Sequence, residues 1–219
     1  MSAEIFARLV TLASSLVLLS GISVLWRHSL PAYIRTFARQ SFLFVLAILL
    51  VAVQVSDVQL YVVAALVFVI KAVFIPRVLR RVQRHVGADI EVRPYVNTPV
   101  SLLLAGVLTL LSYAVASPVV NLGALPTRGG IPLALATVFV GLLIIVSRKS
   151  ALTQIIGFLV MENGIALLAI LATFGVPLIV ELGVFLDVLL GVLVMQVFVY
   201  RIRETFDTID VDRLKHLRH

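Results

Sequence analysis

Apolar stretches of about 20 residues recur along this chain, and each is long enough to cross a lipid bilayer as a helix. Hydrophobic residues make up 61% of the 219 residues, whereas charged residues make up only 13%. A soluble domain of this size does not need so much apolar surface. The sequence therefore predicts an all-α fold, a polytopic membrane helix bundle.

Apolar runs separated by Pro, Gly and polar residues predict about seven transmembrane helices. The expected spans are residues 4–26, 39–56, 59–79, 98–118, 131–147, 152–173 and 178–200. The polar gap from Val55 to Gln59 must be a turn, because a fused helix of about 40 residues is far too long for one crossing. Pro76 is expected to end or bend the third span. The basic segment 78–93 is expected to be amphipathic and to lie against anionic lipid or a partner subunit.

The basic residues predict the orientation of the bundle. With seven spans, 15 of the 18 Lys and Arg residues fall on one side, Arg8 and Arg128 fall on the other, and Lys71 lies inside a span. The positive-inside rule places the larger group in the cytoplasm, so the N-terminus is expected outside and the C-terminus inside. The net charge of +7 is therefore interpreted as a topology signal and not as a sign of nucleic-acid binding.

The residue types that hold cofactors are scarce. Cysteine is absent, which excludes disulfides, thiolate metal sites and cysteine nucleophiles. The four histidines lie in polar connections or in the tail, and none stands at metal-ligand spacing with another. There is no phosphate-binding glycine loop and no Ser-His-Asp arrangement that could be placed. We expect no catalytic residue, no metal and no cofactor on this chain.

Three charged side chains, Glu162, Asp187 and Lys71, lie inside the apolar spans. Glu162 is roughly 15 Å from the cytoplasmic end of its span at 1.5 Å per residue, and Asp187 is also near mid-depth. Charge at such a depth is costly to keep and is functional by default. One interpretation is a proton relay, in which these groups gain and lose protons. The other is a fixed ion pair or hydrogen bond that joins helices.

Four further polar residues have structural interpretations, and for the two acids among them a role in transport is open as well. Glu181, at the start of the seventh span, can cap the helix through its dipole or serve as an outer-side relay group. Asp57 is expected to be a polar turn residue, and its second interpretation is the entrance of a proton path. Asn163 and Gln154 are expected to hydrogen-bond between helices.

Three segments carry a resemblance to a known family. Gly157–Ile165 (GFLVMENGI), Asp187–Gly191 (DVLLG) and Lys71–Pro76 (KAVFIP) resemble component E of hydrogenase-4 and formate hydrogenlyase type complexes. Over its last three helices, that family is similar to the small K-type subunit of respiratory complex I and to the C-type subunit of multisubunit sodium/proton antiporters. Glu162 matches the first buried acid of the K-type pattern. At the second acid this chain has Asp187 in place of Glu, which shortens the reach but keeps the protonation chemistry.

The resemblance implies a division of the chain and a role. Residues 1–125 would be an additional four-helix membrane part, residues 126–202 a three-helix K-type core, and residues 203–219 a cytoplasmic tail. The chain would be a non-catalytic, multi-pass subunit in the cell inner membrane. Its partners would be antiporter-like membrane subunits, a cytoplasmic [NiFe]-hydrogenase module and the lipid bilayer. Redox-coupled proton or sodium translocation would use Glu162, Asp187 and Lys71.

Two alternatives remain open from the residues alone. The chain could belong to a cation/proton antiporter without a redox partner, because the proton chemistry is shared. It could also be a structural membrane scaffold whose buried charges only fix the packing of helices.

Overall fold

The computed structural model describes residues 2–86, 95–122 and 126–174, and the described chain is helical without strands. The helices are α1 (Ala3–Leu25), α2 (Leu30–Val55), α3 (Val58–Val67), a π-helical turn η1 (Phe68–Phe74), α4 (Ile75–Val86), α5 (Thr98–Leu122), a 3₁₀ turn η2 (Arg128–Gly130), α6 (Ile131–Ser147) and α7 (Ala151–Thr173). Six helices of this part are long and apolar enough to span a membrane, with α3, η1 and most of α4 forming one of them. The all-α membrane fold is thereby confirmed. The expected seventh span, 178–200, lies outside the described residues.

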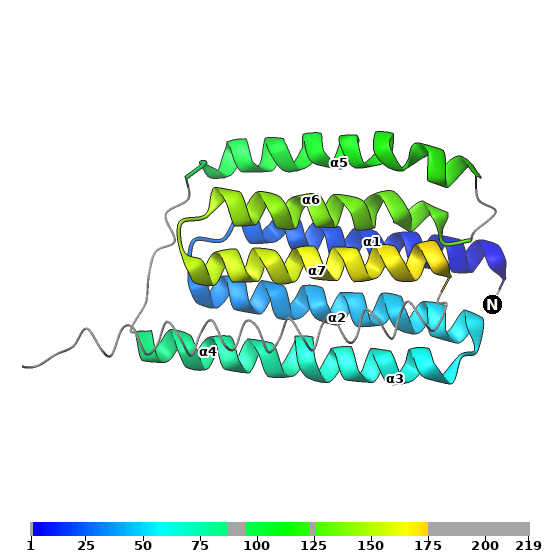
Figure 1. The fold of residues 1–219 in the computed structure, drawn as a ribbon, viewed down its shortest axis with the longest axis horizontal. Helices are drawn as coiled ribbons and strands as arrows, with labels where there is room; N and C mark the ends of the chain where they lie inside the picture. Colours follow the sequence, from blue (N-terminus) through cyan, green and yellow to red (C-terminus); the bar gives the residue numbers. More distant parts are fainter. Residues whose placement is uncertain (1, 87–94, 123–125, 175–219) are drawn as a thin grey trace, which may run out of the picture. The chain divides into compact units, whose positions relative to one another are not determined.

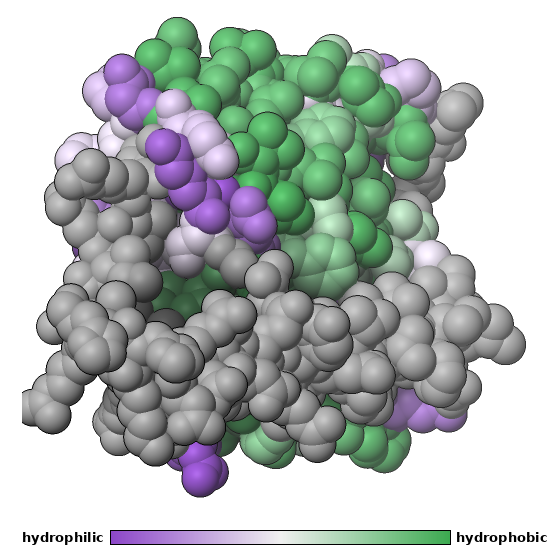
Figure 2. Space-filling view, turned by 60° about the vertical axis from the view of Figure 1, so that its left-hand side comes forward, coloured by the Kyte–Doolittle hydropathy of each residue, from purple (hydrophilic) through white to green (hydrophobic). Residues whose placement is uncertain are grey.

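The long helices lie side by side, with α5 at one edge of the bundle and α3–α4 at the other (Figure 1). The core is formed by apolar side chains of α1, α2, α3, α6 and α7, with one residue of α5, and includes Phe6, Phe44, Ala134 and Leu167. Figure 2 shows a broad hydrophobic surface with hydrophilic residues gathered in a patch and at the margins. An apolar exterior over an apolar core is typical of a bundle surrounded by lipid.

The turn expected between Val55 and Gln59 is confirmed. Ser56 adopts the left-handed conformation at φ 59° and donates its backbone N–H to the carbonyl of Ala52. The Asp57 carboxylate accepts the backbone N–H of Gln59 at 2.9 Å and so caps α3. These two caps satisfy backbone groups that the helix ends would otherwise leave without partners.

Two helices extend beyond the apolar runs that predicted them. α2 begins at Leu30 and not at residue 39, with a proline in its first turn, where proline is well tolerated. Arg35 and Arg39 are exposed on this helix, so its first turns carry charge and gave no apolar signal. α5 continues to Leu122 with Pro118 inside it, near its C-terminal end.

Pro76 does not end the third span. The backbone N–H of Ile75 donates to Ile70, five residues earlier, in the π-helical turn η1, and the chain continues as α4 to Val86. Proline has no N–H and its ring crowds the preceding turn of an α-helix, whereas a π turn is wider and its bonds are offset. The described part of the segment 78–93 is therefore a direct continuation of the third helix.

Helices α6 and α7 pack closely because glycines face the opposing backbone. A β-carbon at Gly141 would lie 2.5 Å from the backbone nitrogen of Met161, and one at Gly164 would lie 2.7 Å from that of Val138. Small residues allow such close approach between membrane helices. The residue next to Met161 is Glu162, so this contact also sets the position of the acidic group.

Substitution of Gly141 by Ala is expected to destabilise the bundle. The added methyl group meets main chain, which cannot move aside, and overpacking of this kind costs about 1–3 kcal/mol. Thermal unfolding of the detergent-solubilised protein should show a lower melting temperature. Gly106→Ala is the matched control, because a β-carbon there meets nothing within 4 Å. Equal melting temperatures for the two variants would contradict the close packing of α6 against α7.

Candidate functional site

The two buried charges predicted on the third and sixth spans meet in the structure. The Lys71 ammonium lies 3.4 Å from Oε2 of Glu162, and their side chains are 1% and 6% exposed. Lys71 comes from the π turn η1 and Glu162 from α7. Buried opposite charges at this distance form an ion pair that is only weakly screened.

An amide and a hydroxyl extend this pair towards α2. The Lys71 ammonium donates a hydrogen bond to Oδ1 of Asn163 at 3.1 Å, and Nδ2 of Asn163 donates to the Ser41 hydroxyl at 3.2 Å. Asn163 and Ser41 are fully buried. The network therefore joins η1, α7 and α2, and it confirms that Asn163 hydrogen-bonds between helices.

An aromatic ring forms part of the wall of the site. The Lys71 ammonium lies 5.9 Å from the centroid of the Phe44 ring, within the range of a cation–π interaction. Phe44 belongs to the apolar core and is 1% exposed. The ring thus contributes attraction to the cation and keeps the surroundings apolar.

The arrangement brings a basic and an acidic side chain together in an apolar setting. An ammonium group has three N–H donors, so Lys71 can hold Asn163 and Glu162 together. Its 3.4 Å contact with Glu162 is longer than a charge-assisted hydrogen bond, typically about 2.7–2.9 Å, so a small approach of the side chains would complete a transfer path. Within the described residues, no group of three or more His, Asp or Glu could hold a metal ion.

The remaining predicted residues are Asp187, Glu181, Asp57 and Gln154. Asp187 and Glu181 lie outside the described residues. Asp57 caps α3. Gln154 donates to the backbone carbonyl of Arg148 at 2.9 Å, which ties the start of α7 to the end of α6.

Ser41 and Phe44 belong to the site, but the sequence analysis did not select them. Ser41 follows Gln40 at the start of the second predicted span, and such a polar pair in a span was an available signal. Phe44 is one apolar residue among many in α2 and offers no signal of its own.

Arg148 lies between the fifth and sixth predicted spans, yet the structure buries it completely. Its guanidinium donates to the carbonyl of Leu25 at 2.8 Å and lies 5.9 Å from the centroid of the Tyr33 ring. Burial lowers the pKa of Arg148, and the Tyr33 hydroxyl partly opposes this effect. Arg148 therefore anchors the α6–α7 loop against α1 and α2. It is also one of the 15 basic residues from which the orientation was predicted.

Fold and site together define a polytopic helical membrane protein with a buried, inter-helical ion pair. The chain is 39% identical to the uncharacterized protein Rv0085 of Mycobacterium tuberculosis, over the full length of both. It is 28% identical over 205 residues to hydrogenase-4 component E of Escherichia coli K12 and of Shigella flexneri, which covers 94% of this chain and 95% of each relative. The chain belongs to the same family as Rv0085 and is a homologue of hydrogenase-4 component E. No family model and no solved structure matches it.

A double-mutant cycle should detect the ion pair. Lys71→Met and Glu162→Gln each break a buried pair, a change that typically costs about 3–5 kcal/mol. The double variant should lose less stability than the sum of the two, with a coupling of about 0.5–3 kcal/mol. Thermal or denaturant unfolding in detergent measures this quantity.

The exposed pair Arg8–Glu4, 2.6 Å apart and 80% and 76% exposed, supplies the control cycle. Solvent screens such a pair, so its coupling should be close to zero. Strict additivity at Lys71 and Glu162 would show that the two groups do not interact.

Proposed function

We propose that this chain is a membrane subunit of a hydrogenase-type complex in the cell inner membrane and that its buried charges take part in redox-coupled translocation of protons or sodium ions. The observation that carries the proposal is the Lys71–Glu162 pair, held between η1 and α7 away from solvent. The relationship to hydrogenase-4 component E supports the assignment to such a complex. Catalysis and redox cofactors belong to partner subunits in this proposal.

The proposed step is a proton transfer within the pair. An N–H bond of the Lys71 ammonium breaks and an O–H bond forms at Oε2 of Glu162, which leaves a neutral amine and a neutral acid. In an apolar site the neutral pair avoids the cost of burying two charges, while the charged pair gains their attraction. The balance is therefore sensitive to any charge that arrives nearby. Electron transfer in a partner module would supply such a change in the nearby charge.

Asp187 and Glu181 complete the proposed path. Asp187 would be the second hopping carboxylate and Glu181 an outer-side group, both within the C-terminal K-type part, residues 126–202. The partners would be antiporter-like membrane subunits and a cytoplasmic hydrogenase module of the formate hydrogenlyase type.

Glu162→Gln should leave the complex assembled and greatly reduce proton pumping. Glutamine keeps the size and a hydrogen-bonding oxygen but cannot exchange a proton in this role, and loss of one acid–base group typically costs about 100-fold or more in rate. Pumping is measured by a pH-sensitive dye in vesicles that contain the purified complex. Glu4→Gln makes the same chemical change at an exposed position and should pump normally. Normal pumping by a variant that combines Glu162→Gln with Asp187→Asn would refute the relay.

Lys71→Arg distinguishes a relay from a scaffold. Arginine keeps the positive charge and can still pair with Glu162, but it does not release its proton in proteins. A relay predicts an assembled complex with a loss of pumping on the order of 100-fold. If Lys71→Arg pumps normally while Lys71→Met fails to assemble, the pair is a structural link.

The identity of co-purifying chains separates the hydrogenase-type proposal from an antiporter. Purification of the intact complex and mass spectrometry of its subunits should find hydrogenase large and small subunits. Antiporter subunits alone would assign the chain to a cation/proton antiporter without a redox partner.

A further inference from the structure

The two basic residues that the charge count set apart from all others line one groove. Arg8 belongs to α1 and Arg128 to η2, yet both border a groove of about 960 Å³ between α1, the end of α5 and the connection to α6. On the orientation predicted from the charge count, both would lie on the outer side of the membrane, which runs against the usual bias. Their convergence on one groove, independent of the proposed relay, suggests a shared partner.

Small residues on α1 leave room for the groove. Ala3, Ala7, Thr11 and Ser15 follow one another at intervals of four residues and all line it, since that spacing keeps side chains on one helix face. The Thr11 and Ser15 hydroxyls each donate at 2.8 Å to the carbonyl four residues earlier. Because these hydroxyl hydrogens are engaged, the side-chain donors left for a ligand in the groove are those of the two guanidinium groups.

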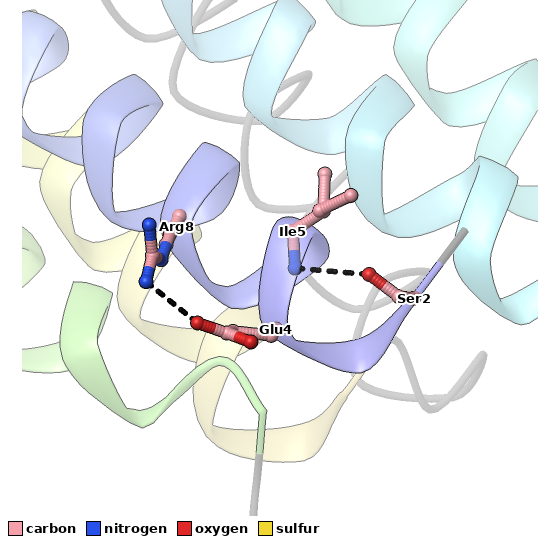
Figure 3. A network of polar contacts seen from close by, with 4 residues as sticks. All are labelled: Ser2, Glu4, Ile5 and Arg8. Carbon is pink, nitrogen blue, oxygen red and sulfur yellow. Dashed lines mark hydrogen bonds and ion pairs between the residues drawn. The ribbon is translucent and has the colours of Figure 1, made fainter.

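The groove has an excess of positive charge. Nη2 of Arg8 bonds to Oε1 of Glu4 at 2.6 Å, while the backbone N–H of Ile5 is capped by Ser2 (Figure 3). Glu4 thus neutralises part of one guanidinium, and Arg8 keeps further N–H groups. Within the described chain, Arg128 forms no ion pair.

The position of Arg128 adds to this excess. It lies directly before the N-terminus of α6, which has no acidic residue in its first turn. The dipole of α6 disfavours a cation there. An anion between Arg8 and Arg128 would relieve the repulsion.

The groove continues into an apolar surface. Leu12 lines it, and Leu16 and Leu19 follow on the same side of α1 at helical spacing; the three are 56%, 40% and 59% exposed. A ligand with a negative head and an apolar body matches both parts. A partner's carboxylate would satisfy the arginines but would not account for the apolar strip beside them.

We propose that this groove binds an anionic phospholipid, with its phosphate between Arg8 and Arg128 and an acyl chain along Leu12, Leu16 and Leu19. Guanidinium groups bind phosphate oxygens by paired N–H donors. The lipid would cover the gap between α1 and α5.

The test uses the complex as purified from membranes, so that the groove keeps its native surroundings. Native mass spectrometry measures retained lipid after incubation with phosphatidylglycerol or with zwitterionic phosphatidylethanolamine. Removal of two basic contacts at about 1 kcal/mol each predicts that Arg8→Gln/Arg128→Gln binds phosphatidylglycerol about 30-fold more weakly. Arg35→Gln/Arg39→Gln removes the same charge from exposed positions on α2 and should bind as the parent does. Melting temperatures confirm that both variants remain folded.

Three results would overturn the proposal. The first is unchanged phosphatidylglycerol binding in the Arg8/Arg128 variant, and the second is equal loss in the α2 control. The third is equal binding of phosphatidylethanolamine by the parent, which would show that charge plays no part. If the Arg8/Arg128 variant instead loses a subunit while its lipid is retained, the groove is a protein interface. Pumping does not enter these measurements, so they fail or succeed independently of the relay.

Discussion

An ammonium group buried among apolar helices requires acceptors, because neither lipid nor aliphatic side chains can solvate it. Lys71 finds its acceptors on α7, where Glu162 and Asn163 are consecutive residues. Asn163 in turn donates to Ser41 of α2. One buried charge thus fixes how η1, α7 and α2 lie against one another, and the packing of the surrounding core must agree with that arrangement.

The other face of α7 makes this arrangement possible. Gly141 and Gly164 bring the backbones of α6 and α7 so close that neither glycine can carry a side chain without a shift of main chain. Met161 lies at this contact and Glu162 follows it immediately. The acidic group is therefore positioned by backbone contact on one side and by polar contacts on the other. Such a position is more rigid than one set by flexible side chains alone, which is what the proposed proton exchange would require.

The sequence predicted those features that depend on the length of apolar runs, on helix breakers and on the depth of a charge within a run. The bounds of α6 and the turn at Ser56 and Asp57 followed from apolar length and from breakers, and depth alone identified Lys71 and Glu162. The early start of α2 was missed, because a helix whose first turns carry Arg35 and Arg39 has no apolar signal there. The π turn at Lys71 has no sequence signature beyond Pro76, since it depends on how one turn accommodates a missing N–H. Burial of Arg148 was missed for a similar reason: long-range contacts with Leu25 and Tyr33 decide it.

The contacts of Lys71 allow two roles, a structural link between helices and a part in a proton relay. Its location in a π turn makes the two compatible. The hydrogen bond between Asn163 and Ser41 joins α7 to α2 without any part of Lys71, so that link can persist while the lysine moves. Within η1 the backbone bonds are already offset by one residue, and Pro76 removes a further donor at its end. A local change between π and α geometry would rotate Lys71 relative to Glu162 and leave α3 and α4 intact. In the proposed function, the Asn163–Ser41 link would serve as scaffold and the ion pair as the movable element of the relay.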